Sequence, residues 1–135
     1  MGLARTAALV LGGIYVLVGI AGFIPALVPA GPDEGMESAS GALLGMFPTN
    51  AVHNIVHLAI GAALLFGSTA RPTAIIVSRV VGATYVVVGL AGIPFPNGFG
   101  LLPLGGADIL LHLATGAALL YIGYLTPAEE ASSSA

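Results

Sequence analysis

The segment FPTNAVHNIVHLAIGAALL, which spans Phe47–Leu65, joins a long apolar run to two histidines and two asparagines. From Ala51 to Gly67 the chain contains no acidic residue, no lysine, no arginine and no proline. A run of this kind approaches the roughly 20 apolar residues that a helix needs to cross a bilayer core of about 30 Å. The segment therefore predicts a membrane helix, and its polar side chains require an explanation.

The composition of the whole chain agrees with a membrane location. Of its 135 residues, 57% are hydrophobic and 7% are charged, and the mean hydropathy is +1.04. These values lie outside the range of ordinary soluble domains. The chain has no lysine and a net charge of -3, so it offers no basic surface for nucleic acid. It also has no cysteine, so histidine and carboxylate side chains would have to hold any metal ion.

Four apolar segments are long enough to be considered as spans, and they predict an all-α membrane protein with four transmembrane helices. Loops rich in proline and glycine separate them, and the first of these, Val28–Ala42, is acidic because of Asp33, Glu34 and Glu37. Residues 1–127 are expected to form a single domain, followed by a polar tail over 128–135. The predicted spans are about Thr6–Pro25, Ala51–Gly67, Thr73–Ile93 and Gly106–Tyr124.

The arginines predict the orientation in the membrane. Arg5 precedes the first span, and Arg71 and Arg79 flank the turn between the second and the third. Because positive loops stay in the cytoplasm, we expect a multi-pass protein of the inner membrane with both termini cytoplasmic. A cleaved signal over residues 1–30 is disfavoured, because the apolar run is longer than a usual signal core and its sequence recurs later in the chain.

The chain contains an internal duplication. GGIYVLVGIAG (Gly12–Gly22) returns as GATYVVVGLAG (Gly82–Gly92) at a shift of 70 residues. The segment Phe47–Leu65 returns as LPLGGADILLHLATGAALL (Leu102–Leu120) at a shift of 55 residues. We therefore expect two tandem copies of a helical hairpin, at about 6–67 and 73–124. Each copy crosses the membrane twice, so both enter from the same side and form a parallel repeat.

Polar residues form a stripe on each of two predicted helices. At about 100° per residue, the stripe of the second span comprises Asn50, His53, Asn54, His57 and Gly61, and that of the fourth comprises Asp108, His112 and Thr115. The duplication aligns His57 with His112 and His53 with Asp108. The first and third spans carry faces of small residues that allow close helix packing, and we expect Tyr15 and Tyr85 to direct their hydroxyls toward the polar stripes.

The simplest interpretation of the stripes is hydrogen bonding between helices, since such bonds are common in membrane bundles. A second is a path for protons or ions through His53, His57, Asp108 and His112. The path is disfavoured because the inner halves of the spans contain no histidine or carboxylate, so a relay would stop halfway.

A third interpretation is a bound metal or haem. His53 and His57, four residues apart, can bind one ion from one helix face, and His112 and Asp108 would complete a shell suited to zinc or iron. Alternatively, His57 and His112 could be the two axial ligands of a b-type haem. An enzyme is disfavoured, because the sequence has neither a nucleophile elbow nor a pair of central carboxylates.

The polar motif also resembles a known family. Its elements are Pro48, Asn50, His53, Asn54, His57, Leu58 and Gly61, followed in the second half by LLPLGGADILLHLATG. Together they are similar to the bacterial four-helix integral membrane family called domain of unknown function 4383. The resemblance implies four membrane helices but does not imply any particular activity. The second-half motif of the family often has an asparagine before the aspartate, where this chain has Gly105 and Gly106.

The sequence thus favours a structural or accessory membrane protein in the lipid bilayer, acting as a homo-oligomer or with a membrane-protein partner. In this interpretation, Asn50, Asn54, Tyr15 and Tyr85 join the histidines in an interhelical polar cluster. The alternative is a protein that binds haem, a transition metal or another small ligand at His53, His57, His112 and Asp108.

Overall fold

The structure is a computed structural model that describes residues 1–30 and 39–125. These residues are mostly helical and form four α-helices: α1 (Leu3–Ala21), α2 (Ala51–Gly67), α3 (Arg71–Ala91) and α4 (Ala107–Leu125). By length and composition, α1, α3 and α4 can each cross a membrane, whereas α2 is a shorter apolar helix. The acidic residues Asp33, Glu34 and Glu37 and the tail over 128–135 lie outside the described residues.

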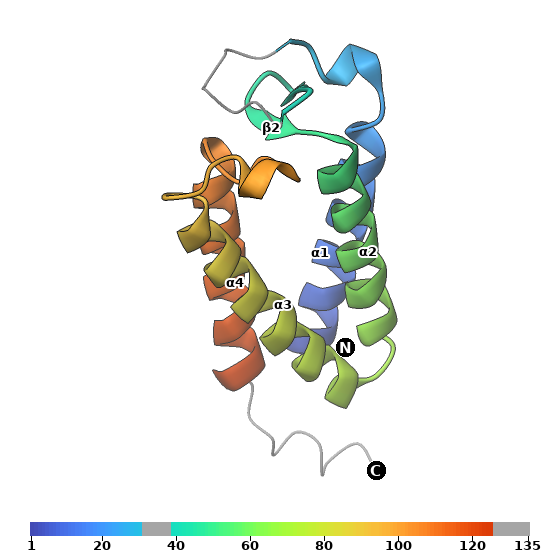
Figure 1. Ribbon diagram of the computed structural model, residues 1–135. Coiled ribbons are helices and arrows are strands. Elements are labelled where there is room, and N and C mark those ends of the chain that lie inside the picture. Colours follow the sequence, from blue (N-terminus) through green and yellow to red (C-terminus); the bar gives the residue numbers. More distant parts are fainter. Residues whose placement is uncertain (31–38, 126–135) are drawn as a thin grey trace.

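The helices associate in two pairs. α1 packs along α2, and α3 packs along α4, and the two pairs then contact each other (Figure 1). Within the first pair, a Cβ atom on Gly12 would lie 2.8 Å from the amide nitrogen of Leu65. Within the second, a Cβ atom on Gly82 would lie 2.9 Å from the amide nitrogen of Leu120. Each pair therefore has backbone-to-backbone contacts that only glycine permits.

Large apolar side chains cover the outside of the helices. Leu17, Val87 and Leu110 are 67%, 66% and 75% exposed. Small and polar residues lie inside instead, including Ala4, Ala8 and Ala74. This distribution is typical of a protein whose helices face lipid, because lipid tails are as apolar as these side chains. It agrees with the membrane character of the composition.

A short β-hairpin connects α1 to α2, so the expectation of an all-α fold was incomplete. β1 (Gly41–Leu43) pairs antiparallel with β2 (Phe47–Thr49). The turn between them contains Leu44 and Gly45, which have positive φ angles of 54° and 73°. Strands of three residues are too short to show the alternating pattern from which strands are predicted. β2 contacts α4, which places the hairpin over the end of the bundle where α2 and α4 begin (Figure 1).

The helix ends follow local signals. α2 has the predicted bounds, and its first turn is capped by the side chain of Asn50, which accepts a hydrogen bond from the His53 amide. α1 ends at Ala21, four residues before the predicted limit, and Pro25 begins a short 3-10 turn, Pro25–Leu27. A second such turn, Gly98–Gly100, lies between α3 and α4.

Candidate functional site

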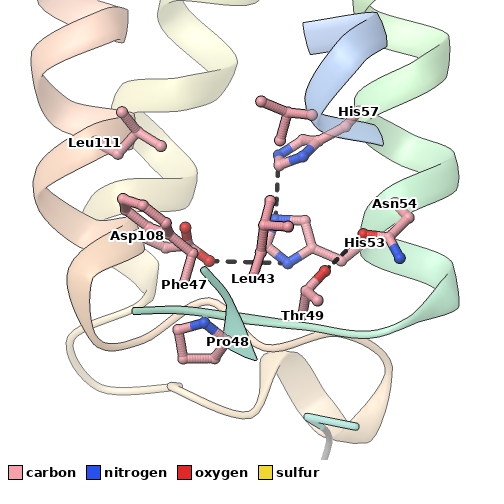
Figure 2. Close-up of a pocket in the computed structure, with 10 residues that line it drawn as sticks. Leu43, Phe47, Pro48, Thr49, His53, Asn54, His57, Asp108 and Leu111 are labelled. Carbon is pink, nitrogen blue, oxygen red and sulfur yellow. Dashed lines mark hydrogen bonds and ion pairs between the residues drawn. The ribbon is translucent and has the colours of Figure 1, made fainter. Parts of the chain in front are cut away.

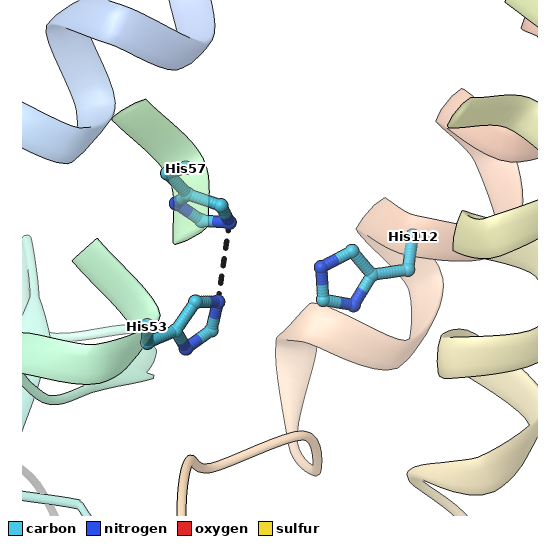
Figure 3. Close-up of side chains that lie close together, drawn as sticks. All are labelled: His53, His57 and His112. Carbon is cyan, nitrogen blue, oxygen red and sulfur yellow. Dashed lines mark hydrogen bonds between the residues drawn. The ribbon is translucent and has the colours of Figure 1, made fainter. Parts of the chain in front are cut away.

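Three histidines lie together where the two helix pairs meet. His53 and His57 lie one turn apart on α2, and His112 lies on α4; they are 2%, 6% and 2% exposed. The Nε2 atoms of His53 and His57 are 3.1 Å apart, and the ring of His112 points toward that pair (Figure 3). Each histidine offers one ligand atom, and these three atoms lie within 4.8 Å of one another. We call these residues the histidine cluster.

Two tyrosines adjoin the cluster. The ring of Tyr15 lies 5.3 Å from that of His57, and the ring of Tyr85 lies 5.1 Å from that of His112. The two tyrosine rings are 5.2 Å apart. The Tyr15 side chain also interacts with the side chains of Thr115 on α4 and of Tyr85. Both rings therefore pack against the polar stripes of α2 and α4.

Asp108 joins the cluster from the first turn of α4. It is 2% exposed, and its Oδ2 atom lies 3.8 Å from Nδ1 of His53. The separation exceeds that of a direct hydrogen bond. The structure thus places His53 of α2 beside this carboxylate as an ion-pair candidate.

Several polar atoms at this site are buried without a hydrogen-bond partner among the described residues. They are Nδ1 of His53, Nδ1 of His112, Oδ2 of Asp108 and the hydroxyl of Tyr85. Most buried polar atoms in proteins have a hydrogen-bond partner, so four atoms without one beside three histidines are unusual.

The two asparagines have different surroundings. Asn54 accepts a hydrogen bond of 2.7 Å from the hydroxyl of Thr49, and its amide packs directly against Gly22, the residue that follows α1. Asn50 lies at the start of α2, where it caps the helix and donates a hydrogen bond of 2.9 Å to the carbonyl oxygen of Leu101. Asn54 therefore supports the helix that carries the histidines, and Asn50 ties that helix to the loop before α4.

A small cavity opens beside the histidines, under the β-hairpin. Its volume is about 30 Å³, enough for a water molecule, which needs about 10–15 Å³ measured in the same way. Thr49 and the rest of the hairpin were missed as site residues, because a contribution from a short strand has no signal in the sequence. The cavity, shown in Figure 2, is lined by Val18, Leu43, Phe47, Pro48, Thr49, His53, Asn54, His57, Asp108 and Leu111.

The turn that precedes α4 explains the glycine at position 106. Gly106 has a φ angle of 67°, a left-handed conformation that glycine adopts freely and asparagine tolerates better than most residues. The carbonyl oxygen of Gly106 accepts a hydrogen bond from the amide of Ile109 as α4 begins. This turn brings Asp108 into the interior.

Comparison with known proteins gives one match. The sequence model of a family described as a domain of unknown function (DUF4383) matches residues 5–125. No curated protein and no solved structure matches the chain.

Proposed function

The chain belongs to the DUF4383 family, and we propose that it is a membrane protein that holds one divalent transition-metal ion on His53, His57 and His112. The observation that carries the proposal is the convergence of three buried histidines from α2 and α4, with their ligand atoms within 4.8 Å of one another. Imidazole suits zinc, copper, iron and nickel.

The distances are compatible with an ion. Two nitrogen ligands at about 2.0–2.1 Å from a tetrahedral zinc ion are about 3.4 Å apart. The Nε2 atoms of His53 and His57, at 3.1 Å, are already close to that spacing. The farthest pair of ligand atoms, within 4.8 Å, must close by at most about 1.4 Å, which rotation of the His112 ring can supply. The fourth position of the ion would remain for a water molecule or another ligand.

The unpaired polar atoms favour this proposal over a purely structural cluster. Interhelical hydrogen bonding would pair the polar atoms of the cluster with one another. Within the described residues, however, the histidines make one hydrogen bond to each other, while Nδ1 of His53, Nδ1 of His112 and Oδ2 of Asp108 remain unpaired. A structural or accessory role in a complex is the competing proposal, and the experiment below separates the two.

Packing favours an ion over a haem. The rings of His57 and His112 are 6.4 Å apart, but Tyr15 and Tyr85 each pack against one of them. The ring of His53 lies 4.4 Å from that of His57. These three side chains take up the space that a porphyrin between His57 and His112 would need.

The proposal includes a membrane arrangement of four spans in two tandem parallel hairpins, within one domain over 1–127. It is supported by the equivalent contacts of the two pairs. Gly12 approaches Leu65 as Gly82 approaches Leu120, and the residues in each contact differ by the shifts of 70 and 55 found in the sequence. Because α2 is shorter, it would span with its capped end just inside the outer interface.

We further propose an inner-membrane protein with both termini in the cytoplasm, surrounded by lipid and able to pair with a second copy or a partner protein. Arg5 donates a hydrogen bond to the carbonyl oxygen of Ser68, and Arg79 donates one to that of Gly123, both near the ends of α2 and α4. Positive charge favours the cytoplasmic side. The histidine cluster lies near the opposite ends of these helices and would occupy the outer half of the membrane.

The test is elemental analysis and an optical spectrum of the protein purified in mild detergent from its native membrane. We expect about one zinc, copper, iron or nickel ion per chain, lost in His57→Ala and in His112→Ala. Ile55→Ala is the matched control, because Ile55 lies between the two histidines on α2 and is exposed. A Soret band would show that the site holds haem instead of a metal ion. A colourless protein that takes up no zinc, cobalt or copper after chelation would overturn the proposal and leave the histidines as structural groups.

A further inference from the structure

Resting on the proposed ion site, we propose that Asp108 is a positioning residue that orients His53, rather than a ligand of the ion. The two nitrogens of the His53 ring face different surroundings. Nε2 faces His57 at 3.1 Å, inside the histidine cluster, whereas Nδ1 faces Oδ2 of Asp108 at 3.8 Å (Figure 2). A histidine that binds a metal ion through one nitrogen commonly donates its other N–H to a carboxylate.

The unpaired atoms agree with this pairing. Nδ1 of His53 and Oδ2 of Asp108 are both buried without a hydrogen-bond partner among the residues described, and they lie 3.8 Å from each other. A neutral imidazole carries one N–H and one lone pair. A carboxylate beside Nδ1 favours the tautomer with the proton on Nδ1, which leaves the lone pair of Nε2 directed at the cluster.

The placement of the carboxylate disfavours direct ligation. An ion bound to Nε2 lies on the cluster side of the His53 ring, but the Asp108 oxygen approaches the opposite nitrogen. The set of ligand atoms that lie within 4.8 Å of one another consists of the three histidines. Asp108 therefore lies beside Nδ1, on the side of the His53 ring opposite the proposed ligand atom Nε2.

The gap of 3.8 Å can be closed in two ways. It exceeds the 2.7–3.2 Å of a direct hydrogen bond, but a small rotation of the Asp108 side chain shortens it. The cavity of about 30 Å³ beside both residues also has room for one water molecule that hydrogen-bonds to both atoms. In either case, the carboxylate favours a proton on Nδ1 of His53, whose side chain also interacts with the backbone carbonyl of Pro48.

His53 and Asp108 occupy equivalent positions in the two copies of the hairpin. Position 108 in the second copy corresponds to position 53 in the first. In the proposed site, the residue of the first copy is a histidine that binds the ion, and the residue of the second copy is a carboxylate that orients this histidine. The two copies therefore contribute different groups to one site.

The test compares Asp108→Asn with the unaltered protein, using zinc and cobalt(II) alone as probes. Asparagine keeps the size of the side chain and removes its charge. We expect ion affinity to fall about 10–100-fold, as is typical of outer-shell partners, while one ion still binds and the cobalt absorption spectrum keeps its shape. Leu110→Ala is the matched control, because Leu110 lies in the same turn of α4 as Asp108 and is 75% exposed, and the ion affinity of this variant should be unchanged.

Nitrogen NMR of His53 provides a readout that does not depend on a variant folding. In the unaltered protein, Nδ1 of His53 should be protonated and Nε2 unprotonated; the reverse pattern would overturn the assignment. An unchanged affinity in Asp108→Asn would overturn the positioning role while leaving the ion site intact. A changed cobalt spectrum would instead make Asp108 a ligand, which also overturns it. If the unaltered protein binds no ion, the proposed function itself fails.

Discussion

Gly12 of α1 and Gly61 of α2 lie backbone against backbone. A Cβ atom on Gly12 would lie 3.0 Å from the carbonyl oxygen of Gly61, and a Cβ atom on Gly61 would lie 2.9 Å from that of Gly12. Gly82 and Gly116 show the same relationship between α3 and α4, at 3.0 and 2.9 Å. Helices that approach this closely gain van der Waals contact where lipid supplies no hydrophobic drive. The contacts hold α2 and α4, which carry the histidines, against their partners.

Adjacent glycines on α1 allow a matched test of this packing. Gly12→Ala should lower the stability of the folded protein by about 1–3 kcal/mol, because the added methyl group would overlap the backbone of α2. A Cβ atom on Gly13 meets nothing within 4 Å, so Gly13→Ala should be neutral or stabilise by up to about 1 kcal/mol through helix propensity. Thermal unfolding in one detergent measures both. Equal melting temperatures for the two variants would contradict the close contact.

The two tyrosines should respond unequally to loss of the hydroxyl. The Tyr15 side chain interacts with those of Thr115 and Tyr85, whereas Tyr85 interacts with Tyr15, and its hydroxyl makes no hydrogen bond of good geometry among the described residues. Tyr15→Phe should therefore cost about 0.6–1 kcal/mol, and Tyr85→Phe should cost less.

Thermal unfolding of both tyrosine variants, alone and combined with Thr115→Val, measures this difference. In the Thr115→Val background, Tyr15→Phe should have a smaller further effect, because one of its two partners, Thr115 and Tyr85, is already gone. Equal losses of stability for Tyr15→Phe and Tyr85→Phe would contradict the prediction that the two tyrosines differ.

Asn50 combines two contacts that can be separated. Asn50→Asp keeps an oxygen that caps α2 through the His53 amide but removes the donor to Leu101, whereas Asn50→Ala removes both. Capping contributes about 1 kcal/mol, so we expect Asn50→Ala to be less stable than Asn50→Asp by about that amount. Helix content and melting temperature in detergent provide the comparison. If Asn50→Asp is as unstable as Asn50→Ala, the bond to Leu101 dominates.

The proposed orientation predicts the behaviour of fusions to the C-terminus. Green fluorescent protein attached after Ala135 should fluoresce, and alkaline phosphatase attached there should be inactive, because the three arginines favour a cytoplasmic end. The opposite pair of results would show that the protein has the reverse orientation, with the histidine cluster in the inner half of the membrane.

Much of the helical framework could be read from the chain. The apolar runs predicted four helices because the length and composition of a run limit what it can do in a bilayer, and α2 begins and ends where expected. The polar stripes on α2 and α4 also followed from helical geometry alone. These features depend on residues that are near one another in the sequence.

What the sequence could not supply depended on contacts between distant segments. The β-hairpin has too few residues for a periodic pattern, yet it closes the cavity beside His53. The pairing of Asp108 with His53 likewise depended on the relative rotation of α2 and α4.

The sequence by itself determined that this is an apolar, helical protein with histidines on two helix faces, because composition and periodicity act over a few turns of chain. The tertiary structure decided that His53, His57 and His112 converge, that Asp108 faces Nδ1 of His53, and that Tyr15 interacts with Thr115 as well as with Tyr85. The physical reason is that side-chain chemistry at a site depends on distances of a few ångströms between helices, and those distances are set by glycine contacts and helix crossing, which no single segment encodes.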